Sequence, residues 1–89
     1  MIRVAQGSPF KRAYKNFVRS HPELKSRIDE RLALFINNPY SPELETHKLH
    51  GKLAERWAFS INFKYRVLFH FESSDLAFLE DIGTHDDIY

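Results

Sequence analysis

Cysteine is absent from the 89-residue chain. Disulfide bonds and thiolate metal sites are therefore excluded, and a reducing cytoplasm is the expected location. Residues 1–12 contain no apolar stretch long enough for a signal peptide or a membrane span, so we expect no association with a membrane. Internal repeats and low-complexity tracts are also lacking.

Aromatic residues, by contrast, are plentiful. The chain has eight Phe, four Tyr and one Trp, and 43% of its residues are apolar. This is enough for one compact core, although a chain of this length buries only a modest fraction of its surface. We therefore expect a single folded domain that covers residues 1–89.

Charge is distributed unevenly along the chain. Residues 1–40 hold eight Lys/Arg and three Asp/Glu, a net charge of +5, whereas residues 41–89 hold five and nine, a net charge of −4. A basic segment of this kind attracts nucleic acid or an acidic protein. It is equally consistent with a helical surface that only faces solvent.

Two amphipathic helices are predicted in the first half. Ser8-Pro9 suits an N-cap followed by the first helical residue. Apolar residues recur at helical spacing through 10–18 and again through 24–36, and Asn37-Asn38-Pro39 ends the second helix. Because only Ser20-His21-Pro22 separates the two patterns, the helices should form a hairpin.

The second half changes to a period of two, which is typical of strands. After a loop at 38–51, three strands should form an antiparallel meander joined by an N-terminal strand, with the helical hairpin on one face. The predicted class is therefore α+β, in the order strand, helix, helix, three strands. The strands are expected at 2–6, 57–61, 65–71 and 76–82, with turns at 62–64 and 73–75.

Alternation also assigns strand side chains to the two faces of the sheet. The side chains expected to face the helices are those of Trp57, Phe59, Val67, Phe69 and Phe71. The side chains expected to face away from them are those of Arg56, Ser60, Arg66 and His70.

Three segments carry a resemblance to a known family: HKLHG at 47–51, YRVLF at 65–69 and DIGTHDDIY at 81–89. In this order and length they resemble the RelE/ParE toxin superfamily of type II toxin–antitoxin modules, over essentially the whole chain. The ending with His85 is most similar to the YafQ-like ribonuclease branch. The resemblance implies a RelE-like fold, an mRNA endoribonuclease that acts in the ribosomal A site, and an acidic antitoxin as partner.

Such a ribonuclease needs few groups. The RNA supplies the nucleophile, its 2′-OH, so the protein must remove that proton, stabilise negative charge on phosphorus and protonate the leaving 5′ oxygen. Histidine suits both proton transfers because it titrates near neutral pH. Arginine or lysine suits the stabilisation of the negative charge on phosphorus. Neither a metal nor another cofactor is required.

His85 and Arg66 are the leading catalytic candidates. His85 follows directly after the last strand, a position where functional side chains are commonly displayed, although a solvated tail histidine has the same pattern. Gly83 is expected to let the chain turn off that strand. Arg66 is expected to project from a middle strand and needs either solvent or an anion. The resemblance implies that His85 transfers a proton and that Arg66 contacts the scissile phosphate.

Further candidates are weaker. The resemblance implies a site histidine at His47 and a terminal aromatic at Tyr89, which stacks on a base, transfers a proton or anchors the tail. Asp86 and Asp87 either orient His85 or only solubilise the tail. The RNA-binding candidates are His50, Lys48, Lys52 and Arg56. A metal site formed by the histidines is not expected, since no carboxylate spacing supports it.

The chain departs from the family pattern in three ways. The outward positions of the strand at 57–61 offer Arg56, Ala58 and Ser60 rather than lysines. The further His and Asp that the YafQ-like branch has near the next turn are not matched, and no C-terminal helix is expected. Two alternative functions therefore remain open: a ParE-like inhibitor of DNA gyrase that acts by binding, and a module that only binds an antitoxin.

Overall fold

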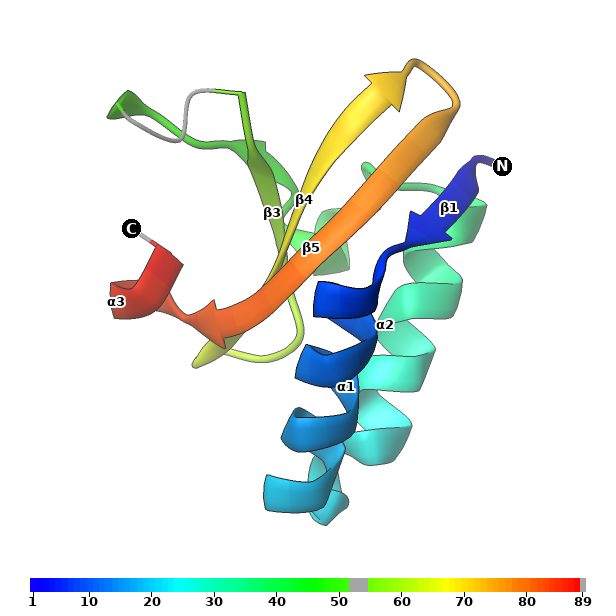
Figure 1. Ribbon diagram of the computed structural model, residues 1–89. Helices are drawn as coiled ribbons and strands as arrows, with labels where there is room; N and C mark the ends of the chain where they lie inside the picture. Colours follow the sequence, from blue (N-terminus) through cyan, green and yellow to red (C-terminus); the bar gives the residue numbers. More distant parts are fainter. Residues whose placement is uncertain (52–54, 89) are drawn as a thin grey trace.

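The computed structural model describes residues 1–51 and 55–88 (Figure 1). Helices α1 (Ser8–Ser20) and α2 (Lys25–Asn37) lie side by side on one face of the sheet. A single 3₁₀ turn, Pro22–Leu24, connects them. The predicted helical hairpin is therefore confirmed, and α2 ends at Asn37 as expected.

The described residues form one five-stranded sheet in the order β1-β5-β4-β3-β2. β1 pairs with β5 in parallel, and the other neighbours are antiparallel. The α+β class and the predicted meander are confirmed, and β5 runs two residues further than expected. The strands are β1 (Arg3–Gln6), β2 (His47–Lys48), β3 (Trp57–Ser60), β4 (Tyr65–Ser73) and β5 (Leu76–Thr84).

The core lies between the helices and the sheet. Phe59, Val67 and Phe69 are fully buried there, and Phe35 of α2 stacks on Phe59 with ring centroids 4.5 Å apart. Trp57 and Phe71 are partly buried at the margin of the same cluster. The strand residues predicted to face the helices therefore do so, because alternation along a strand places them on one side.

The start of α1 differs from the prediction by one residue. Gly7, not Ser8, is the N-cap, and its carbonyl accepts the backbone N–H of Lys11 at 3.1 Å. A Cβ at Gly7 would lie 2.9 Å from the tip of the Phe78 ring, so a larger residue at this point would require the ring to shift.

The segment predicted as a loop at 38–51 contains regular structure. It holds a 3₁₀ turn, Pro42–Leu44, and the short strand β2. Leu49 continues the pairing by donating its N–H to the carbonyl of Arg56 at 2.9 Å, and it packs with Ala58 and Leu68. Ala58 is consequently buried, so the sheet face away from the helices is partly covered rather than open.

The end of the chain also differs from the prediction. A C-terminal helical turn is present, α3 (His85–Ile88). Thr84 and Asp87 hold it by reciprocal capping: each backbone N–H donates to the side chain of the other, at 3.1 and 3.2 Å. Gly83 lies inside β5, so the chain turns off the strand at Thr84 and not at the glycine. No helix of the described residues is long and apolar enough to cross a membrane.

Candidate active site

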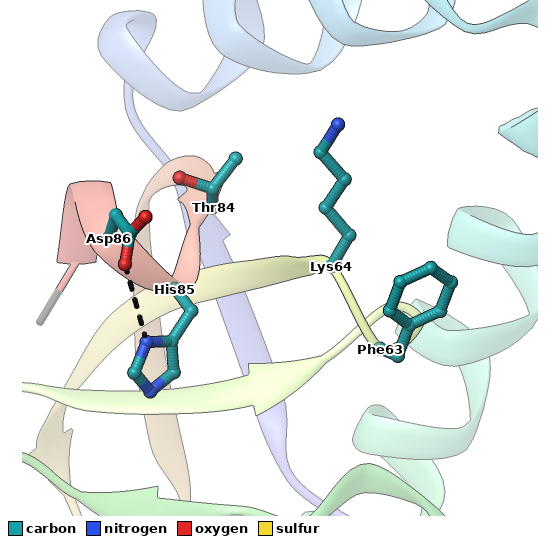
Figure 2. A pocket seen from close by; sticks show the side chains of 5 residues that line it. All are labelled: Phe63, Lys64, Thr84, His85 and Asp86. Atoms are coloured by element: carbon teal, nitrogen blue, oxygen red, sulfur yellow. Dashed lines mark ion pairs between the residues drawn. The ribbon is translucent and has the colours of Figure 1, made fainter.

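A pocket lies between the β3–β4 turn and the start of α3 (Figure 2). Its volume is about 310 Å³, which is at the lower end of the range for ligand sites. One wall is the turn before β4 and the other is the end of β5, and the two meet where Tyr65 pairs with Thr84. The residues that line it are Phe63, Lys64, Thr84, His85 and Asp86.

His85 is the first residue of α3, and its side chain is 65% exposed. Its Nδ1 atom lies 3.9 Å from a carboxylate oxygen of Asp86, whose side chain is fully exposed. An ion pair this long and this hydrated contributes little energy. The capping by Thr84 and Asp87 is the stronger constraint, because it fixes the backbone that carries the imidazole.

Arg66 lies at the same end of the sheet. It is the second residue of β4 and pairs with Ser60 on one side and Gly83 on the other. Its Nη1 atom donates to the carbonyl oxygens of Asn62 and Tyr65 and, at 3.5 Å, to the Ser60 hydroxyl. No residue of the described chain accepts a hydrogen bond from its Nε or Nη2. The Nη1 atom of the guanidinium thus holds the β3–β4 turn by hydrogen bonds. The N–H groups of Nε and Nη2 can donate to an anion.

His47 shares a sheet face with Arg66. It pairs with Ala58, and Ala58 pairs with Leu68, so all three side chains project away from the helices, as Arg66 does. Strand spacing places the Cα atoms of His47 and Arg66 roughly 12 Å apart. His47 is exposed, and its Nδ1 lies 2.9 Å from the carbonyl oxygen of Glu45. It lies on the same sheet face as Arg66 but on β2, two strands away from β4.

The other predicted contacts are dispersed. Lys48 pairs with Trp57, which faces the helices, so Lys48 projects to the opposite side from His47. His50 is exposed just beyond β2. Lys52 and Tyr89 lie outside the described residues. Of the predicted set, the structure therefore brings His85 and Arg66 to one end of the sheet, with His47 on the same face.

Arg56 is engaged by an acidic partner. Its Nε donates to Glu80 at 3.0 Å, and Glu80 also lies 2.9 Å from Nδ1 of His70. Nε2 of His70 lies 2.7 Å from Glu72, so the histidine stands between two carboxylates. The hydrogen bond to Glu72, followed by that to Glu80, raises the pKa of His70 above its ordinary value even though burial opposes this. Glu80 balances the charge of Arg56. Glu72 and Glu80 hold the His70 ring between them, so we assign His70 a structural role.

Sequence reasoning missed Phe63, Lys64 and Thr84 as site residues. The first two were predicted only as a turn, and Thr84 only as part of the tail. The motif Thr84-His-Asp-Asp87 matches a capping box and could have revealed α3. The described chain contains no group of three or more His, Cys, Asp or Glu side chains placed to hold a metal ion.

No protein-family model matches this chain, and no curated protein matches it in sequence. Solved structures of small bacterial toxins, however, share its fold. YafQ from E. coli strain BL21(DE3) has a TM-score of 0.79 at 15% identity, over 100% of this chain and 99% of that chain. The YoeB/ParE toxin from Agrobacterium tumefaciens has a TM-score of 0.76 at 14% identity, over 94% and 99%.

A chain of the E. coli DinJ–YafQ complex gives a TM-score of 0.78 at 15% identity, over 100% of this chain and 99% of that chain. At these identities the likeness is one of fold. The RelE-like fold that the three short segments predict is confirmed.

Proposed function

We propose that the protein is the toxin of a type II toxin–antitoxin module and cleaves mRNA. The observation that carries the proposal is the pocket beside His85, where an exposed imidazole and the ammonium of Lys64 lie at the same end of the sheet as Arg66. An acid–base group next to cations is the equipment that RNA cleavage through the 2′-OH requires. The shared fold with YafQ and the YoeB/ParE toxin supports the assignment as a toxin.

In the proposed reaction the 2′ oxygen attacks the adjacent phosphorus. The O2′–P bond forms, the P–O5′ bond breaks, and the products are a 2′,3′-cyclic phosphate and a 5′-hydroxyl. His85 transfers one proton, and His47 or Tyr89 transfers the other. Arg66 directs its Nε and Nη2 donors at the phosphate oxygens, where negative charge increases in the transition state. No cofactor takes part.

RNA contacts are assigned to His50, Lys48, Lys52 and Arg56, as the sequence predicts. Arg56 and Lys48 are the least suited of these, because Glu80 already balances the charge of Arg56 and Lys48 projects to the opposite side of the sheet from His47. Among the described residues, Lys64 and Arg66 are the cations that we assign to the pocket end of the sheet, and two cations are few to hold a strand of mRNA. This favours cleavage on the ribosome, where ribosomal RNA positions the substrate in the A site.

The partner is proposed to be a small acidic antitoxin. One side of α1 is basic and exposed, and acidic residues are absent from that helix. Attraction between opposite charges speeds association and favours an acidic partner. E. coli YafQ, which has the same fold, forms a toxin–antitoxin complex with DinJ. The exposed cations of α1 are Lys11, Arg12, Lys15 and Arg19.

Expression in bacterial cells tests the function. Growth should stop because translation is blocked, and primer extension on a reporter mRNA should map cuts at codons that ribosomes occupy. Intact mRNA together with gyrase-dependent DNA breaks would instead identify a ParE-like inhibitor. Intact mRNA and intact DNA, with binding to an antitoxin retained, would identify a module that only binds its partner.

A further inference from the structure

Phe63 is the most exposed aromatic side chain of the described residues. It is 90% exposed, whereas Tyr40, the next aromatic, is 58% exposed and contacts the Trp57 and Phe71 rings. Phe63 stands at the tip of the β3–β4 turn and at the rim of the pocket (Figure 2). A phenyl ring gains nothing by facing water, so its position is unfavourable unless something covers it.

The turn that carries Phe63 is held rigidly. The side-chain oxygen of Asn62 accepts the backbone N–H groups of Lys64 and Tyr65 at 3.0 and 2.8 Å. The Asn62 carbonyl accepts the hydroxyl of Ser60 at 2.8 Å and the guanidinium of Arg66.

A further hydrogen bond ties the turn to the helical layer. Arg27 of α2 donates from Nε to the carbonyl of Ile61 at 2.9 Å. The base of the turn is therefore fixed both to the sheet and to a helix. A ring on such a fixed support loses little conformational entropy when it is covered, which favours binding.

The chemistry around Phe63 identifies what covers it. Lys64 follows directly, with its Nζ 5.4 Å from the centre of the Tyr65 ring, and Arg66 lies two positions further along β4. His85 lines the other wall of the pocket, opposite the turn (Figure 2). A flat apolar ring beside cations matches a nucleotide, whose base has a π-face and whose phosphate is anionic.

We propose that Phe63 is a base-stacking residue, on which the base of a nucleotide next to the scissile phosphate lies. The inference rests on the proposed ribonuclease function. Stacking on the ring fixes the nucleotide so that its phosphate reaches Arg66 and its 2′-OH or 5′ oxygen reaches His85. Because every base has a π-face and phenylalanine makes no hydrogen bond, the contact positions RNA without selecting one base.

The test is single-turnover cleavage of ribosome-bound mRNA at increasing concentrations of wild-type protein, Phe63→Leu and Phe63→Trp. Leucine keeps an apolar side chain but has no ring, so the half-saturating concentration should rise about 5- to 150-fold, the loss expected for one stacked base. Phe63→Trp should cleave like wild type. Tyr40→Ala, which removes an exposed aromatic outside the pocket, should also cleave like wild type.

The outcomes separate this inference from the function on which it rests. Wild-type protein that does not cleave would refute the ribonuclease proposal itself. Wild-type protein that cleaves, with Phe63→Leu unchanged at every concentration, would refute only the stacking role. The same holds if Phe63→Leu leaves cleavage intact but weakens binding of the antitoxin, since Phe63 would then be a contact for protein. Melting temperatures well above the assay temperature for all variants confirm that the fold is retained.

Discussion

Arg66 combines two roles in one side chain. One guanidinium nitrogen holds the β3–β4 turn, and the remaining donors are placed for a phosphate. Arg66→Ala should therefore lower the cleavage rate by about 10²–10³, the usual loss for one donor to a transition-state oxyanion. It should also lower stability by about 1 kcal/mol, because hydrogen bonds to the turn are lost. Cleavage kinetics and thermal melting measure the two effects.

Ser60→Ala is the matched control for Arg66→Ala. Ser60 donates to the same Asn62 carbonyl but carries no charge. Its loss should reproduce the decrease in stability without the loss of cleavage. If Ser60→Ala reduces cleavage as strongly as Arg66→Ala, the effect of Arg66 comes from the turn, and its assignment to the phosphate is wrong.

At the residue scale the sequence predicted His85 and Arg66, and the structure places both at one end of the sheet. The roles of these residues, and of His47, remain predictions. Phe63 was predicted only as part of a turn, because its position at the rim of a pocket depends on how the turn and the start of α3 lie together in space. Its exposure follows from the geometry of the turn. Arg66 holds the Asn62 carbonyl there, and Arg27, which is distant in sequence, holds that of Ile61.

Among the structural elements, the β3–β4 turn has the largest effect on the site, because it carries Phe63 and Lys64. Asn62→Ala removes the acceptor for two backbone N–H groups and should lower stability by about 1–2 kcal/mol, or about 4–16 °C in melting temperature. Cleavage should also fall, since Phe63 and Lys64 lose their fixed support. Asn62→Asp keeps an oxygen at that position, so it should retain most of the stability and most of the cleavage activity. Equal losses in the two variants would contradict the account of the turn.

The helical hairpin has a polar link that is independent of the site. Tyr14 of α1 donates its hydroxyl to Asp29 of α2 at 2.6 Å, and Lys25 donates to the same carboxylate. Both contacts hold the pKa of Asp29 below its ordinary value, with Lys25 the larger cause. The contribution of the Asp29 carboxylate to stability is therefore present above about pH 3.8, its ordinary pKa. It is lost as the pH falls through the lower pKa that Asp29 has in the folded state.

Tyr14→Phe should lower stability by about 1 kcal/mol at neutral pH, because one hydrogen bond is lost while the ring is kept. It should also reduce the difference in melting temperature between pH 5 and pH 3. Cleavage should be unchanged. Melting curves across that range measure the effect, and a variant as stable as wild type at neutral pH would show that the link between the helices is not stabilising.

The sequence was a good guide to long periodic elements and a poor one to short ones. Both helices and the three-stranded meander follow from apolar spacing, since one face of each is buried in a common core. β2 and α3 have two and four residues, too few for any period to appear. β2 depends on pairing with β3, and α3 depends on the contact between Thr84 and Asp87, so tertiary and local capping interactions determine them.

For the molecule as a whole, the polar network on the outer sheet face makes stability depend on pH. His70 lies between Glu72 and Glu80, which raise its pKa above 6.5. The contribution of protonated His70 to stability is fully present below about pH 6.5, its ordinary pKa. It is lost as the pH rises through the higher pKa that His70 has in the folded state. The melting temperature should therefore fall between about pH 6 and pH 8, by an amount equivalent to about 1 kcal/mol or less.

His70→Gln should remove most of this decrease, because glutamine does not titrate. Melting curves of both proteins at closely spaced pH values measure the difference. A variant whose melting temperature falls with pH as steeply as that of wild type would show that another group is responsible. Cleavage at a fixed pH should change little, since His70 is engaged with carboxylates and does not line the pocket.

The central claim is that His85 transfers a proton during RNA cleavage through the 2′-OH. Purified wild-type protein should cut ribosome-bound mRNA and leave a 2′,3′-cyclic phosphate and a 5′-hydroxyl. His85→Ala should cut at the same position about 10²–10⁴-fold more slowly, the usual loss for a general acid or base, with an unchanged melting temperature. Ends that carry a 5′-phosphate, or a His85→Ala variant that cleaves at the wild-type rate, would contradict the account.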